Sequence, residues 1–218
     1  MKRVGLILFS ILLAAGLAQA QVTVVGSAHD LSSGGPGSTV DTTQVCVFCH
    51  TPHQDTGALA PLWNHTPSSA GPYGAYSSDT MDHTATPLPS TGAAVSTLCM
   101  SCHDGTIAVT SLHNPPNDWT PTVTQGTGNV DGTSQKLTGS PNVGSDMTND
   151  HPINFAIVDS TDAEIRLLAA ITVPLFGAGS NEIQCASCHD PHGSPIPEDP
   201  LLTVTMAASA LCTNCHIK

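Results

Sequence analysis

The chain has 218 residues, of which 17 are acidic and five are basic, so its formal charge at pH 7 is −12 with neutral histidines. A charge of this sign excludes electrostatic binding to nucleic acid. Aromatic residues make up only 4% of the chain, whereas glycine and proline are abundant. The composition therefore predicts little regular structure and a poor conventional core.

The N-terminus has the three parts of a secretory signal peptide. Lys2 and Arg3 precede a mostly apolar stretch from Val4 to Leu17, and Ala18-Gln19-Ala20 is a small-x-small cleavage site. We expect cleavage of residues 1–20 rather than a membrane anchor, because the apolar stretch is short for a bilayer span. The mature chain would have a formal charge of −14, and no other segment is apolar enough to cross a membrane.

All eight cysteines fall in four C-x-x-C-H boxes. Cysteines three residues apart lie on the same side of a helical turn. There, their thiols can form thioether bonds to the two vinyl groups of a haem, and the histidine that follows can bind the iron as proximal ligand. The sequence thus predicts four haem c groups, which would supply the missing core. The boxes are Cys46, Cys49 and His50; Cys99, Cys102 and His103; Cys185, Cys188 and His189; and Cys212, Cys215 and His216.

Three other uses of cysteine explain the pattern less well. A disulfide framework gives no reason for a histidine after every pair, and zinc knuckles tolerate many residues at that position. A thioredoxin-like motif normally occurs once, beside a strand–helix unit. Covalent haem attachment by this motif takes place outside the bacterial inner membrane, so we expect an exported protein, extracellular or on the cell surface, with the periplasm as the alternative.

The boxes form two pairs within a single predicted domain, residues 21–218. The first pair spans about 46–103 and the second 185–216, and C-V-F-C-H-T-P-H at Cys46 resembles C-A-S-C-H-D-P-H at Cys185. The fold class expected is a multihaem cytochrome c, mostly coil with short helices and few strands wrapped around a stacked chain of four haems. Residues 67–92 and 114–150 read as irregular, the latter with a short hairpin around Asp131-Gly132.

One longer helix is predicted between the two pairs. Thr161 and Glu164 form a capping box, residues 163–171 are good helix formers, and Pro174 limits the helix end.

Seven histidines outside the boxes can supply the sixth iron ligand, and we expect them rather than methionine (Met81, Met100, Met147 or Met206). His53 and His192 each stand three residues after a box histidine. We assign His53 to the haem of His103 and His192 to the haem of His216. His29 and His151, each beside an acidic residue, are the next candidates. The remaining three, expected to face solvent or haem propionates, are His65, His83 and His113.

Several short sequence motifs resemble those of a known family: H-D-L-S at His29, V-C-V-F-C-H-T-P-H at Val45, A-P-L-W-N at Ala60, D-H-P-I at Asp150 and C-A-S-C-H-D-P-H-G at Cys185. Together with the other boxes they resemble the paired C-x-x-C-H multihaem cytochromes. Within these, the chain is most similar to the extracellular tetrahaem cytochromes of metal-reducing bacteria that polymerise into filaments (the outer-membrane cytochrome E type).

The resemblance implies four bis-histidine haems in a continuous stack. It also implies a homopolymer in which one haem of each subunit takes its distal histidine from the neighbour. His29 or another histidine outside the boxes would play that role, and we choose His29, because an N-terminal arm can reach another subunit.

The expected function is electron transfer without enzymatic activity, in an extracellular filament whose partners are redox cytochromes or external acceptors. A monomeric periplasmic shuttle is the alternative. A multihaem reductase would need a five-coordinate haem, and the surplus of histidines argues against one.

Overall fold

The computed structural model describes residues 24–37, 42–53, 62–92, 94–117, 129–159, 161–193 and 201–217. The expected signal peptide lies outside the described residues. Regular structure in the described part consists of short pieces joined by coil, as the composition predicted. They are the 3-10 helices η2 (Val45–Phe48), η3 (Leu168–Ala170) and η4 (Ala207–Ser209), the α-helices α2 (Val95–His103), α3 (Cys185–Cys188) and α4 (Ala210–Cys215), and the strands β1 (Phe155–Ala156) and β2 (Glu182–Ile183).

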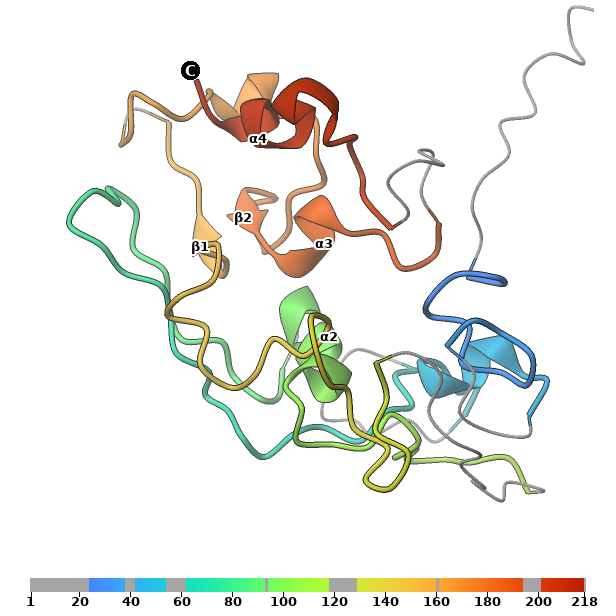
Figure 1. The fold of residues 1–218 in the computed structure, drawn as a ribbon. Coiled ribbons are helices and arrows are strands. Elements are labelled where there is room, and N and C mark those ends of the chain that lie inside the picture. The colour runs from blue at the N-terminus through green and yellow to red at the C-terminus, as the bar shows by residue number, and fades with distance from the viewer. Residues whose placement is uncertain are drawn as a thin grey trace, which may run out of the picture.

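The four boxes all lie on short helical turns, and these turns follow one another in chain order. Figure 1 shows α4 near α3, then α3 facing α2, with the light-blue turn of η2 beyond α2. Helices α2 and α3 are in contact. Within the described residues, no helix is both long and apolar enough to cross a bilayer.

Buried polar groups join α2 to α3. The Ser96 N–H donates to Gln184 Oε1 at 3.3 Å, and the Cys185 N–H donates to Ser96 Oγ at 2.8 Å. Gln184 and Ser187 form a capping box at the start of α3. Strands β1 and β2, paired antiparallel with Phe155 opposite Ile183, lead into this turn. Because Ser96, Gln184 and Ser187 are buried, these bonds fix the second box against the third.

The first and third boxes are built by the same backbone pattern. His50 forms an isolated bridge with Trp63, and His189 forms one with Leu202 at the same spacing along the sequence. In the first copy, Thr51 donates to the Leu62 carbonyl and Asn64 to the Cys49 carbonyl.

In the third box, the equivalent bonds run from the Asp190 N–H to the Leu201 carbonyl and from the Thr203 N–H to the Cys188 carbonyl, both at 2.9 Å. Even the left-handed backbone of Leu62 recurs, at Leu201. The sequence repeat therefore corresponds to a structural repeat.

The apolar core is small and lies against α2. Tyr73, Leu88, Met100 and Met147 form the buried cluster. Tyr73 and Leu88 pair through two backbone hydrogen bonds of 2.8 and 3.2 Å. A cluster of this size stabilises one box rather than the whole chain, as the composition implied.

The helix predicted over residues 163–171 is wrong. In the structure, this segment runs alongside the fourth box: the Arg166 N–H donates to the Cys215 carbonyl and the Ile217 N–H to the Glu164 carbonyl, both at 2.7 Å. Only the 3-10 turn η3 remains. Pairing with the C-terminus satisfies the backbone groups that a helix would have used, so tertiary contacts override helix propensity. The hairpin around Asp131 is confirmed, with Val130 bridged to Leu137.

We predict that Ser96→Ala destabilises the protein by about 1–3 kcal/mol, because it leaves the Cys185 N–H without its acceptor. Denaturant unfolding of the exported, intact protein would measure the change. The matched control is Ser78→Ala, since the Ser78 hydroxyl pairs with exposed Thr80. Equal unfolding midpoints for both variants would contradict the structural role of Ser96.

Candidate haem-binding site

Each box histidine is held on the same helical turn as its two cysteines. The His50 N–H donates to the Cys46 carbonyl at 2.9 Å, His189 to Cys185 at 3.0 Å and His216 to Cys212 at 2.9 Å. The second box reaches the same arrangement inside α2, which ends at His103. This closed turn presents two thiols and one imidazole together, as covalent haem attachment requires.

Thiols of successive boxes lie close enough to influence one another. Burial raises the pKa of Cys102, and nearby Cys49 of the first box raises it further. A hydrogen bond to Cys185 raises the pKa of Cys99. Burial raises the pKa of Cys188, with a smaller contribution from Cys215 of the fourth box. The thiols that would attach the haems are therefore neighbours in the order first, second, third and fourth box.

Three box histidines each face a second histidine. Ring centroids are 6.0 Å apart for His29 and His103, 6.0 Å for His50 and His192, and 6.3 Å for His151 and His216. A metal–imidazole bond is about 2 Å and the ring centre lies about 1 Å beyond the nitrogen, so two imidazoles on opposite sides of one metal ion are roughly 6 Å apart. The three pairs thus fit bis-histidine haem iron, which would shuttle one electron between its ferric and ferrous states.

Backbone carbonyls orient two of these rings. His103 Nδ1 lies 2.7 Å from the Pro141 carbonyl oxygen, and His151 Nδ1 lies 3.0 Å from that of Pro152. A carbonyl accepts, so the proton sits on Nδ1 and the Nε2 lone pair is available to a metal. Sequence reasoning missed both carbonyls. Pro152 could have been found in D-H-P-I, whereas Pro141 is far from His103 in sequence and gives no such signal.

The environment of these histidines favours the neutral form that binds a metal. Burial lowers the pKa of His29 to about 4, with a smaller contribution from His103. Burial also lowers the pKa of His103 and of His50. His29 Nδ1 is buried without a hydrogen-bond partner. At neutral pH, protons therefore do not compete with a metal ion for the ring nitrogens, and these rings can act as ligands.

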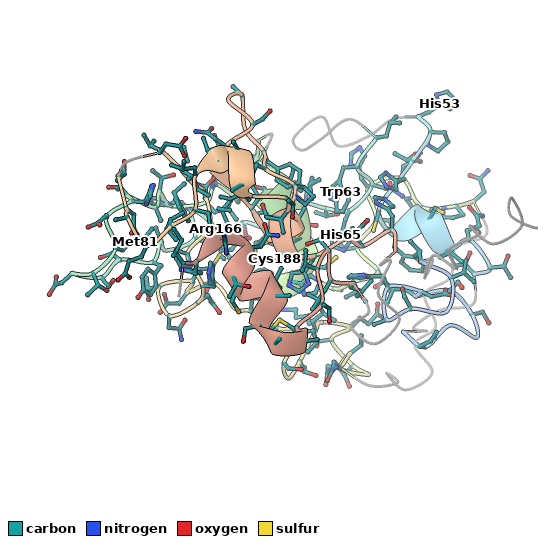
Figure 2. The ribbon with its side chains drawn as sticks, turned by 90° about the horizontal axis from the view of Figure 1, so that it is seen from above. His53, Trp63, His65, Met81, Arg166 and Cys188 are labelled. Carbon is teal, nitrogen blue, oxygen red and sulfur yellow. The ribbon has the colours of Figure 1, made fainter. Side chains whose placement is uncertain are left out.

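The partner assignments expected from the sequence differ from those in the structure. His192 faces His50, not His216. His103 faces His29 of its own chain, not His53. His53 is exposed, and Figure 2 shows it at the outer edge of the molecule, away from Cys188.

The three remaining histidines have different environments. His65, expected to face solvent or a propionate, is fully buried instead. His83 Nε2 accepts the Val158 N–H at 3.2 Å, and its ring lies beside Phe155. His113 is exposed as predicted. Of the methionines weighed as ligands, Met100 and Met147 pack in the apolar cluster.

The arrangement is pairwise rather than clustered. In the part of the chain that the structure describes, no three histidine, cysteine or acidic side chains gather around a point that could hold a metal ion. A structural zinc site needs four protein ligands, whereas a haem iron takes only two from the protein and four from the porphyrin. The histidine pairs suit the second case.

A comparison with protein families agrees with this geometry. Residues 178–218 match the family model described as "Doubled CXXCH motif". This segment contains the third and fourth boxes. The match supports a multihaem c-type cytochrome that binds haem c covalently and transfers electrons. No curated protein matches the chain.

We predict that replacing His29, His151 or His192 by alanine converts one low-spin haem of the exported protein to a high-spin form, because each substitution removes one axial ligand. Electron paramagnetic resonance of the ferric protein would measure the change. His113→Ala should leave the spectrum unaltered. Low-spin spectra for all three variants would contradict the assigned pairs.

The ring planes predict two kinds of low-spin signal. The His50 and His192 planes are nearly parallel, at 19°, whereas the other pairs are close to perpendicular, at 76° and 81°. Parallel axial imidazoles give a rhombic ferric signal, and perpendicular ones give a signal with a large maximum g value. Removing His192 should weaken the rhombic signal and spare the signals of the two perpendicular pairs.

Proposed function

We propose that this protein transfers electrons through four covalently bound bis-histidine haems. The observation that carries the proposal is the spacing of 6.0–6.3 Å in three independent histidine pairs, each containing one box histidine. The ligand pairs are His29 with His103, His50 with His192, and His151 with His216. Two axial histidines saturate the iron in both oxidation states, so no substrate binds, and the protein acts by spacing and burial.

The neighbouring thiols support a continuous electron path. Cys49 lies near Cys102, Cys99 near Cys185, and Cys188 near Cys215. Haems attached at these points would follow one another from the first box to the fourth. The hydrogen bonds that the Ser96 N–H donates to Gln184 and that Ser96 Oγ accepts from the Cys185 N–H hold the central step at fixed spacing.

The structural repeat supports ligation between subunits. His192 follows the third box and faces the proximal histidine of the first. Its counterpart His53 stands at the same spacing after the first box. By analogy, His53 would face the box histidine of a haem unit that precedes the first box. Residues 1–45 contain no further box. The third box of a neighbouring copy supplies one, because His189 has no ring contact of this kind among the described residues.

The distal ligand of the His189 haem is therefore His53 of the next subunit, in place of His29. A donor at one site and an acceptor at a different site make a head-to-tail contact, which repeats into a filament or closes into a ring. We propose the filament, outside the cell, as the form that carries electrons over long distances to external acceptors. The export expected from the N-terminal segment agrees with that location.

We predict a mass increase of four haems per chain in the exported protein, with no loss of haem under denaturing conditions, because thioether bonds are covalent. Intact-mass spectrometry would measure it. A polypeptide without added mass and without a Soret band would overturn the proposed function.

We predict that His53→Ala prevents assembly and leaves one high-spin haem per chain, because the His189 haem loses its sixth ligand. Negative-stain microscopy and size-exclusion chromatography would measure assembly, and paramagnetic resonance the spin state. The matched control is His113→Ala, another exposed histidine, which should assemble normally. Monodisperse wild-type monomers with four low-spin haems would favour the periplasmic shuttle instead.

A further inference from the structure

His65 is a buried histidine that the three ligand pairs do not use. Its side chain is fully buried, with 0% of the residue exposed. Both ring nitrogens face backbone oxygen atoms: Nδ1 lies 3.1 Å from the Thr66 carbonyl and Nε2 lies 3.1 Å from the Ala108 carbonyl. Neither nitrogen is therefore directed toward an iron.

Two carbonyl neighbours require two donors. A neutral imidazole has one N–H and one lone pair, and a carbonyl oxygen only accepts. In the neutral form, one nitrogen lone pair of His65 therefore faces an oxygen lone pair at hydrogen-bond distance. The imidazolium donates to both Thr66 and Ala108. The backbone around His65 thus offers a hydrogen-bond acceptor to each of the two ring protons of the imidazolium.

A buried carboxylate supplies the opposite charge. Asp104 is 3% exposed and accepts hydrogen bonds from Ser68, Tyr73 and Thr106. Burial opposes its ionisation, but these hydrogen bonds outweigh burial and lower the pKa of Asp104. Its negative charge in turn favours protonated His65.

Few other charges act on His65. Segments 62–70 and 106–112, which surround it, contain no further titratable side chain, and Lys136 lies on the segment that pairs with Ala108. Burial, the largest effect, leaves the pKa of His65 below its ordinary value, although backbone groups of Thr66, Ala108 and Val109 and the charge of Asp104 raise it. These opposing effects leave its protonation sensitive to a small change in nearby charge.

His65 also lies between the first two boxes. The preceding residue, Asn64, donates its N–H to the Cys49 carbonyl at 2.9 Å. On the other side, Asp104 directly follows the box histidine His103. A charge on a haem held by either box would act on His65 through the buried interior, where salt screens little.

We propose that His65 is a redox-linked proton-binding site, which takes up a proton when an electron enters the haem of the first or second box. The proposal rests on the proposed function, since it needs haems at these boxes. One electron from the reductant converts ferric iron to ferrous, and one proton from solvent converts neutral His65 to the imidazolium. The electron added at the haem stabilises the positive charge added at His65, and no other bond changes.

Reduction favours protonated His65, so its pKa is higher in the reduced protein than in the oxidised protein. Between these two pKa values, the reduction potential falls as pH rises, and outside them it is constant. Each tenfold fall in proton concentration lowers a fully coupled one-electron potential by at most about 59 mV.

The test is a spectroelectrochemical titration of the intact, haem-loaded protein between about pH 5 and pH 8, the range in which histidines change charge. Wild-type protein should show at least one haem potential that falls as pH rises, with proton uptake on reduction in weakly buffered solution. His65→Gln keeps an N–H for the Ala108 carbonyl but cannot titrate. It should lose that pH dependence, whereas His113→Gln should keep it.

The second variant is Asp104→Asn, which removes the countercharge and should shift the pH-dependent range toward acid. It keeps the inference testable if His65→Gln fails to fold. Potentials independent of pH in the wild type would overturn the inference. So would full pH dependence in His65→Gln, which would assign the protons to haem propionates. Absence of haem would instead overturn the proposed function, so the two failures are distinguishable.

Discussion

Paired imidazoles about 6 Å apart, the separation across one metal ion, are the constraint on which the rest of this structure depends. The two members of each pair come from distant parts of the chain, yet each pair has this spacing. The pairs are His29 with His103, His50 with His192, and His151 with His216. A chain with one small apolar cluster cannot hold such positions by hydrophobic burial alone. Ligation would join them as cross-links, in the way that a bound metal organises small domains.

Polar contacts around the boxes act at shorter range. Ser96 and Gln184 join α2 to α3 within the buried part of the molecule. Pro141 and Pro152 orient the rings of His103 and His151 through their carbonyls. These contacts make the attachment points rigid relative to one another. Rigid spacing is what electron transfer between fixed cofactors needs, since nothing has to move when the charge moves.

The repeat relates the internal structure to assembly. The first and third boxes share bridges, backbone hydrogen bonds and even a left-handed leucine, Leu62 in one and Leu201 in the other. One copy places its trailing histidine, His192, against a box histidine, and the other leaves His53 exposed at the surface. This difference between the two copies is the basis on which we propose head-to-tail association.

The sequence by itself determined the haem boxes, the predominance of coil, the hairpin near Asp131 and the candidate histidines, because these depend on residue types at short spacing. The tertiary structure alone decided which histidines face each other. Loop paths set that choice, and spacing along the chain does not encode them. It also decided that residues 163–171 pair with the fourth box instead of forming a helix, because the C-terminal backbone offers the same hydrogen bonds. The burial of His65 between two carbonyls was likewise invisible in sequence, since Ala108 lies far along the chain.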